Sequence, residues 1–156
     1  MTLKEELAAQ GVKIIRKDHS WLMRLIGTIM GWFNVDFMGS AWTTISRHRI
    51  YASTRTPESI EQHENLEQWE RVIRHELVHI RQVKKYKWFW QFSYLFLYFP
   101  VGLAWFRWRW EREAYLESDI RQFGRDPDEV ADLLTKMYFH PWPNAWMKRW
   151  FKGQLK

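Results

Sequence analysis

The sequence predicts a mostly helical α+β fold in which a small antiparallel sheet packs beside two long helices, and three observations predict it. Apolar residues recur at three- and four-residue steps over residues 66–86, which is the period of a helix, and a second long helix is expected over 104–123. Residues 41–53 alternate and are rich in Thr, Ile and Tyr, which favours a strand. The length of 156 residues and the 46% hydrophobic content suit one core, so we expect a single compact domain over residues 1–156.

The first half of the chain alternates between helical and extended segments. Residues 3–10 predict a short helix, and residues 21–33, apolar apart from one arginine, predict another. Residues 35–37 are a candidate strand that would form a hairpin with the strand at 41–53. Residues 53–65 are polar and contain a proline, so we expect a loop or turn before the long helix.

The second half is expected to be helical up to its tail. The helix at 104–123 should stop at Gly124, because glycine suits the left-handed conformation that ends many helices. Asp126 and Pro127 should open a third long helix that runs to about residue 138, since both residue types are favoured at first helical positions. The tail, residues 140–156, is basic and aromatic, and two prolines make its beginning non-helical.

Residues 88–106 are the strongest candidate for a membrane-spanning segment, because they are about long enough to cross a bilayer and basic residues flank both ends. Gln91, Ser93 and Pro100 interrupt the stretch, so we interpret it as two apolar pieces joined near residues 99–102. A buried hairpin arm or an aromatic groove is favoured, and peripheral membrane contact through this region stays open as the alternative.

The composition excludes several classes of protein. The 24 Lys and Arg residues against 18 Asp and Glu give a net charge of +6, and 12 residues are Trp. Because the chain has no cysteine, it has no disulfide scaffold, cysteine nucleophile, iron–sulfur cluster or Cys-based zinc knuckle. Its first residues lack the features of a signal peptide, so we expect a cytoplasmic location, with membrane association left open.

Residues 75–79 read His-Glu-Leu-Val-His, the HExxH pattern, inside the helix predicted at 66–86. Residues i and i+4 share one helix face, so the imidazoles of His75 and His79 can each give one nitrogen to the same zinc ion. Glu76 is offset by one position and can take a proton from a zinc-bound water, whose pKa the metal lowers. The pattern predicts one bound zinc ion, with Glu76 as general base.

A catalytic zinc ion needs a third protein ligand, which must come from another element. The candidates are three carboxylates of the helix expected at 104–123 and two histidines elsewhere: Glu111, Glu113, Glu117, His63 and His140. In the competing interpretation the glutamates bind no metal. They lie on a solvent-exposed helix face, where arginines alternate with them and neutralise their charge.

HELVH followed by a helical Glu-x-x-Ala segment resembles the gluzincin branch of zinc metallopeptidases, especially the compact minigluzincins, and the catalytic cores of membrane-bound endopeptidases that process prenylated proteins. The resemblance covers roughly residues 41–120 and implies a zincin-like fold. In that group the Glu that opens E-x-x-A-D or E-x-x-A-N is the third ligand, which implies Glu111, with Ala114 allowing close helix packing and Tyr115 standing where Asp or Asn is usual. A thermolysin-like alignment instead uses Glu113. Glu111 is favoured because Ala114 then lies on its helix face.

The same resemblance implies an antiparallel sheet just before the zinc-binding helix, whose edge strand holds an extended peptide. The strand expected within residues 41–53 stands in the right order along the chain. Tyr138 and His140 are candidates for stabilising the oxyanion that forms during attack on a peptide carbonyl.

Two classes of function follow from the sequence. The first is a zinc metalloendopeptidase with a peptide or protein substrate, in which zinc polarises the carbonyl and Glu76 later passes a proton to the leaving amine. The alternative is a non-catalytic protein that binds a membrane surface or a nucleic acid through its basic and aromatic segments. No nucleic-acid-binding module is recognised and the excess charge is modest, so a nucleic-acid partner is not expected.

Overall fold

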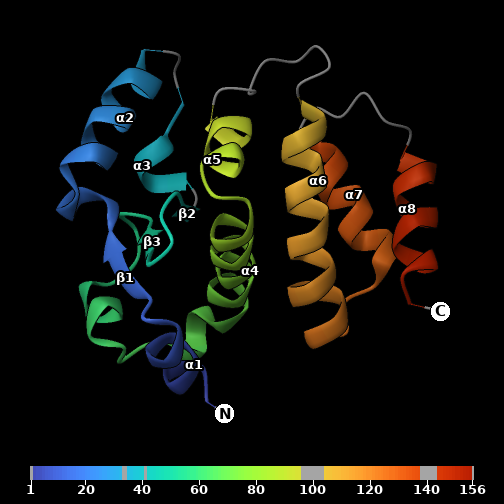
Figure 1. Cartoon of the computed structure of the whole chain (residues 1–156), viewed down its shortest axis with the longest axis horizontal. Coiled ribbons are helices and arrows are strands. Elements are labelled where there is room, and N and C mark those ends of the chain that lie inside the picture. Colours follow the sequence, from blue (N-terminus) through green and yellow to red (C-terminus); the bar gives the residue numbers. More distant parts are fainter. Residues whose placement is uncertain (1, 33–34, 41, 96–103, 138–143, 156) are drawn as a thin grey trace. The chain divides into compact units, whose positions relative to one another are not determined.

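The computed structural model describes residues 2–32, 35–40, 42–95, 104–137 and 144–155 (Figure 1). The chain divides into two compact units, residues 1–81 and residues 82–156. The fold is mostly helical α+β, as predicted, because helices dominate the described residues and one small sheet lies in the first unit. The expectation of a single compact domain stays a prediction.

In the first unit, short helices and strands alternate before one long helix begins. The helix predicted at 3–10 is confirmed, and the one predicted at 21–33 is confirmed as Trp21–Gly31. The helix predicted at 66–86 is confirmed from Glu70 onward, and a 3-10 turn at Glu67–Trp69 precedes it. The elements are α1 (Leu3–Gln10), β1 (Lys13–Arg16), the 3-10 turn η1 (Lys17–His19), α2 (Trp21–Gly31), α3 (Phe37–Ser40), β2 (Thr43–Thr44), β3 (Arg49–Ala52), the 3-10 turns η2 (Glu58–Gln62) and η3 (Glu67–Trp69), and most of α4 (Glu70–Tyr86).

The three strands form a mixed sheet in the order β1–β3–β2. β2 pairs antiparallel with β3, so that Thr44 stands opposite Ile50, whereas β1 pairs parallel with β3 and places Ile14 opposite the same residue. The predicted hairpin with residues 35–37 is wrong, because Phe37 begins the short helix α3. The stretch predicted as one strand at 41–53 instead contains two short strands, β2 and β3, which pair with each other. The antiparallel expectation holds for one of the two pairings, since the parallel strand β1 comes from much earlier in the chain.

The sheet and α4 share one hydrophobic core. The apolar residues of α4 recur at three- and four-residue steps, so Ile73, Leu77 and Ile80 lie on one helix face, and each is at most 2% exposed. Burying a large aliphatic side chain stabilises a fold by about 1.5–3 kcal/mol, so this face fixes how α4 is rotated against the sheet. Their partners in the core are Leu3, Leu7, Val12, Ile14, Trp42, Ile50, Ala52, Ile60 and Leu66.

The described residues of the second unit form helices joined by short turns, and none of them is in a strand. It contains the last turn of α4, then α5 (Trp88–Leu95), α6 (Ala104–Tyr115), its π-helical continuation η4 (Leu116–Gln122), α7 (Pro127–Met137) and α8 (Asn144–Gly153). α6 and η4 together match the predicted second long helix, which ends before Gly124 as expected. Gly124 has a φ of 65°, the left-handed conformation that glycine adopts easily. α7 begins at the predicted proline. The core of this unit is formed by Trp108, Leu116, Ile120, Val130, Ala131, Leu134, Met147 and Phe151.

The aromatic stretch at 88–106 is only partly described. α5 forms its first part and the beginning of α6 its last, while residues 96–103, which contain the predicted junction at 99–102, lie outside the described residues. None of the described helices combines the length and the apolar character that crossing a bilayer requires. In α5, Trp90 is fully buried whereas Trp88 is 72% exposed, so the stretch contributes both to the core and to the surface.

Candidate metal site

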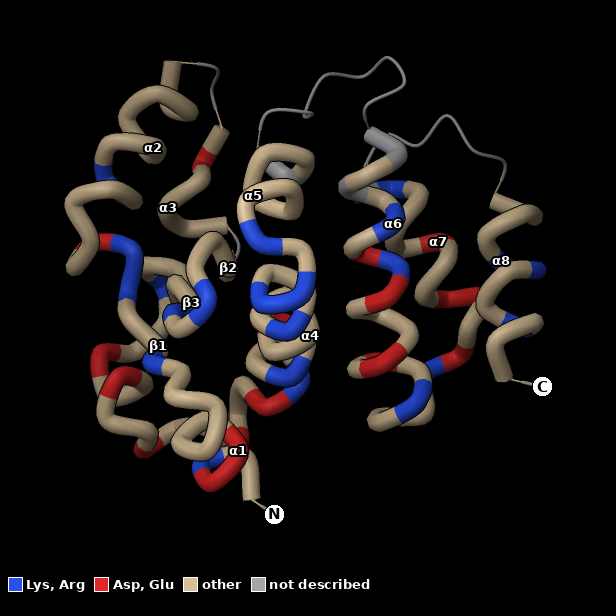
Figure 2. The backbone as a smooth tube through the Cα atoms, viewed as in Figure 1, with Lys and Arg blue, Asp and Glu red and all other residues tan. Residues whose placement is uncertain are grey.

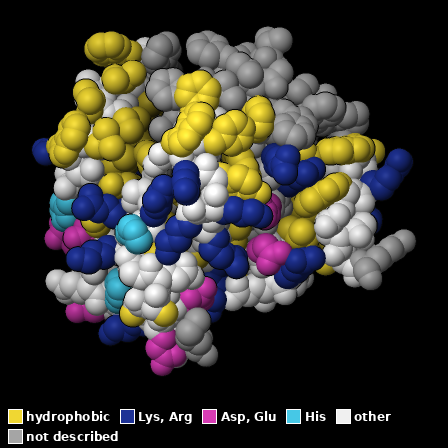
Figure 3. Space-filling model, in the orientation of Figure 1, with side chains coloured by type: hydrophobic (Ala, Val, Ile, Leu, Met, Phe, Trp, Pro, Cys, Tyr) yellow, Lys and Arg dark blue, Asp and Glu magenta, His cyan; other side chains and the backbone are white. Residues whose placement is uncertain are grey.

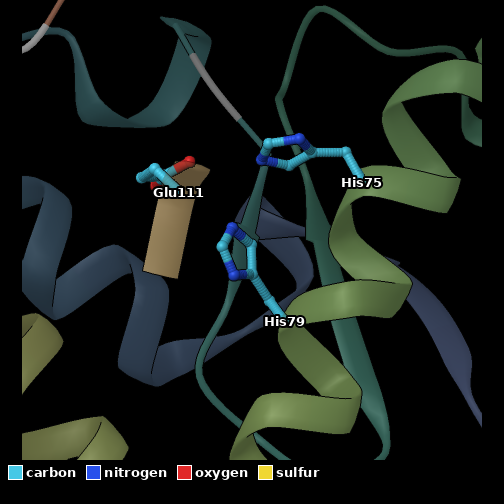
Figure 4. A group of neighbouring side chains, drawn as sticks. All are labelled: His75, His79 and Glu111. Atoms are coloured by element: carbon cyan, nitrogen blue, oxygen red, sulfur yellow. The ribbon is translucent and has the colours of Figure 1, made fainter. Parts of the chain in front are cut away.

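His75 and His79 lie one turn apart on α4, and Figure 4 shows both rings projecting from the same side of the helix. Their ring centroids are 4.9 Å apart and the ring planes meet edge to face at 80°. His79 is 2% exposed, and His75 is half-buried. Two imidazoles at this spacing can direct one nitrogen each toward a shared point, which is the arrangement expected from the HExxH pattern.

Glu76 directly follows His75 in the sequence, and its side chain is buried, with 6% of the residue exposed. Its carboxylate accepts a 2.6 Å hydrogen bond at Oε2 from the hydroxyl of Thr44, which is itself 2% exposed. This distance is typical of an O–H donor bonded to an ionised carboxylate. β2 therefore holds the carboxylate of the predicted general base in one orientation.

Lys17 is a buried cation in the first unit that the sequence did not single out. It is fully buried, its Nζ donates a 2.5 Å hydrogen bond to the carbonyl of Phe37, and Nζ lies 3.8 Å from the centre of that ring. Burial lowers the pKa of Lys17 from 10.5 to about 8, and the negative charges of Glu76 and Asp36 oppose this shift. At neutral pH Lys17 is therefore mainly charged, and its charge acts on Glu76 through the low-dielectric interior.

The carboxylates of the second unit differ in burial. Glu111, on α6, is 2% exposed and is drawn in Figure 4. Glu113 is exposed and accepts a 2.9 Å hydrogen bond from Nε2 of Gln82. Glu117, on η4, forms an ion pair with Arg121 one turn later. Of these three candidates for the third ligand, Glu111 is the one whose carboxylate is withdrawn from solvent.

The arginines of α6 do not all serve to neutralise these glutamates. Arg112 lies over two indole rings, 4.0 Å from the centre of Trp108 and 4.3 Å from that of Trp150. Burial, together with repulsion from Arg109, lowers the pKa of Arg112 to about 10. This guanidinium therefore packs against the aromatic core of the second unit, contrary to the interpretation of α6 as a solvated face of alternating charges.

The other candidates from the sequence have less support. His63 ends η2 in the left-handed conformation, with a φ of 63°, and burial lowers its pKa. Tyr138 and His140, the candidates for stabilising an oxyanion, lie outside the described residues. Their roles stay predictions.

Sequence reasoning missed Thr44 and Lys17, for different reasons. Thr44 lies within the strand predicted at 41–53. Alternation along that strand could have singled it out, because every second residue faces the same side of a sheet and one of these sides faces the HExxH helix. Lys17 offered no such signal, because a lysine that follows a short strand is normally solvated.

Comparison of the chain with models of protein families, with curated proteins and with solved structures finds no match.

Proposed function

We propose that this protein is a zinc-dependent peptidase in which His75, His79 and Glu111 hold one zinc ion and Glu76 acts as general base. The observation that carries the proposal is the arrangement on α4. Both imidazoles leave one side of the helix, and the buried carboxylate between them in sequence is held by Thr44. A surface helix that carried these residues by chance would have no reason to bury Glu76 and His79.

The donor set suits zinc. Among the described residues, His75, His79 and Glu111 form a group of three metal-ligating side chains that could hold one ion. Two imidazole nitrogens and one carboxylate oxygen are a ligand set found in catalytic zinc sites, which leave a fourth position for water or substrate. Softer metals prefer thiolates, which this chain does not contain, and Mg²⁺ and Ca²⁺ prefer oxygen ligands.

Support for Glu111 as third ligand comes from its burial and from the contact that holds the backbone next to it. Gln82 lies near the end of α4 and is 3% exposed. Nε2 of Gln82 donates a 3.1 Å hydrogen bond to the backbone carbonyl of Trp110, the residue directly before Glu111. The backbone beside Glu111 is thus held by a buried side chain, and the buried carboxylate of Glu111 needs a cation to offset its desolvation, which a zinc ion would supply.

The proposed chemistry divides among this chain's own residues. Zinc, when bound, polarises a peptide carbonyl and makes a water molecule more acidic. Glu76 accepts a proton from the attacking water at a carboxylate oxygen and later donates it to the leaving amine. Thr44 keeps that carboxylate in the orientation needed for both transfers, and Lys17 stabilises its negative charge.

β2 is an edge strand of the sheet, so an extended peptide could add to it through main-chain hydrogen bonds. Because the chain has no cysteine, a reducing compartment such as the cytoplasm suits this enzyme.

The metal part of the proposal is tested by measuring zinc in the purified chain by mass spectrometry. We expect one zinc ion per chain in the wild type, and loss of stoichiometric zinc in His79→Ala and in Glu111→Gln. Glu113→Gln is the matched control, because it changes the neighbouring exposed glutamate and should leave the zinc content unchanged. Equally low zinc in the wild type and in His79→Ala would end the proposal.

The catalytic part is tested with a mixed peptide library, whose cleavage products are followed by mass spectrometry. Glu76→Gln should keep its zinc and cleave on the order of 100-fold or more slowly, because amide cannot accept the proton from water. If the wild type and Glu76→Gln hold equal zinc and cleave equally, Glu76 is not the general base.

A further inference from the structure

The inner face of α5 is fixed within the second unit. Trp90 and Ser93 are fully buried on this face. Nε1 of Trp90 donates to Oε1 of Gln82 at 3.1 Å, and Nε1 of Trp110 donates to the hydroxyl of Ser93 at the same distance. These bonds connect the end of α4 with α5 and α6, so the opposite face of α5 is turned outward.

That outer face is aromatic. Trp88 is 72%, Phe92 49% and Phe89 39% exposed, and we refer to these three residues as the aromatic face. The ring of Phe89 meets those of Trp88 and Phe106 edge to face, at centroid distances of 6.4 and 5.5 Å. Soluble proteins rarely expose neighbouring large aromatic side chains unless a partner covers them.

Positive charge borders the aromatic face. Lys84, Lys85 and Lys87 directly precede it, and the last two are exposed. No Asp or Glu stands between Glu76 and Glu111, so the charge of this segment is not compensated along the chain. Figure 2 shows blue without red at the junction of α4 and α5, and Figure 3 shows hydrophobic side chains over α5 next to a dark blue group at the end of α4.

We propose that the aromatic face and its lysines dock this protein on the surface of an anionic lipid bilayer. Trp rings sit at the level of the lipid headgroups, and lysines beside them interact with anionic headgroups, which matches the order of residues here. α5 has eight residues, too few to span a membrane but enough to lie in its interface. A second copy of the chain is a poorer partner, because its own lysines would face these lysines. This inference does not depend on the metal site.

Sedimentation of the full-length protein with vesicles tests the charge requirement. Phosphatidylcholine vesicles that contain phosphatidylserine should bind the protein, and pure phosphatidylcholine vesicles should bind it much less. Lys85→Gln with Lys87→Asn should weaken binding by roughly 10- to 30-fold, since each lysine near an anionic surface contributes about fivefold. Lys136→Gln with Arg149→Gln removes the same charge from α7 and α8 and should leave binding unchanged. Equal effects of the two pairs, or equal binding to both vesicles, would overturn the proposal.

Insertion of the aromatic face is tested separately, because loss of binding in a variant could reflect misfolding. The chain has no cysteine, so Phe92→Cys gives one site for a polarity-sensitive fluorophore, and Phe123→Cys, at another exposed aromatic residue, gives a matched control. Phosphatidylserine vesicles should shift the emission at position 92 to shorter wavelength and leave position 123 unchanged. The absence of a shift at position 92 would contradict docking on lipid. So would a shift at position 92 that appears without vesicles, either on addition of a single-stranded oligonucleotide or on raising the protein concentration.

Discussion

The hydroxyl of Thr44 donates a 2.6 Å hydrogen bond to the carboxylate of Glu76, and both side chains are buried. The bond joins the edge strand β2 to the helix that carries the HExxH residues. A carboxylate that must accept and then return a proton has to keep one orientation, and a short bond to a rigid strand limits its rotation. Thr44 therefore acts on the proposed reaction through Glu76 without contacting the substrate.

Replacing Thr44 with Val should slow peptide cleavage about tenfold while leaving the zinc content unchanged, because valine has a similar shape but no hydroxyl. The loss should fall on kcat with little change in KM, since the missing bond orients the base and does not bind substrate. Steady-state kinetics of the variant measure both constants. Thr44→Ser keeps the hydroxyl and should recover most of the rate, and an equal loss in both variants would point to a packing defect instead.

Lys17 should make stability rise with pH. The pKa of Lys17 is about 8 in the folded chain, below its usual 10.5, so between these values the unfolded chain holds a proton that the folded chain has released. Burial of the charge therefore costs stability at neutral pH, and this cost disappears as the pH rises from about 8 to 10.5. The difference between the two pKa values corresponds to about 3–4 kcal/mol.

Urea denaturation of the wild type and of Lys17→Met over this pH range checks the prediction. Stability of the wild type should rise relative to the variant, which lacks the titrating group, and the difference between their unfolding free energies should level off above pH 10.5. Parallel curves for the two proteins would show that another group causes the pH dependence.

Removing the metal should lower thermal stability. A ligand that binds only the folded state stabilises it by about 2.7 kcal/mol when its concentration is 100 times its Kd. Differential scanning calorimetry should therefore show a lower Tm after treatment with a chelator, and restoration by added zinc but not by added magnesium. His79→Ala should melt at the same temperature with and without the chelator, and a chelator effect of full size in this variant would place the metal elsewhere.

Gln82 should be important for the stability of the second unit. Its side chain accepts from Nε1 of Trp90 and donates to the carbonyl of Trp110, and all these groups are buried. Gln82→Leu removes the hydrogen bonds that Gln82 makes with Nε1 of Trp90 and with the carbonyl of Trp110. The loss should lower the free energy of unfolding by about 2–3 kcal/mol. Gln154→Leu, at an exposed position, should change it by less than about 0.5 kcal/mol. Similar losses in both variants, measured by denaturant titration, would mean that the buried network does not stabilise the unit.

Sequence periodicity predicted the long helices well, because the faces that they bury are set by residues three and four apart. The pattern of Ile73, Leu77 and Ile80 indicated which side of α4 would face a core, and the cap at Gly124 indicated where the second long helix would end. The sheet was predicted less well. The pairing of β1 with β3 joins segments far apart in the chain, and no local pattern encodes which distant strand is the neighbour.

The sequence by itself determined that two histidines and one glutamate share a helix at metal-ligand spacing, because helical geometry alone relates residues one and four apart. Only the tertiary structure decided that Thr44 meets Glu76, that Lys17 is buried as a cation near this carboxylate, and that Glu111 is shielded from solvent whereas Glu113 is not. Burial and contacts between distant segments depend on how whole elements pack, and the free energy of that packing is shared among many side chains rather than carried by any short stretch of sequence.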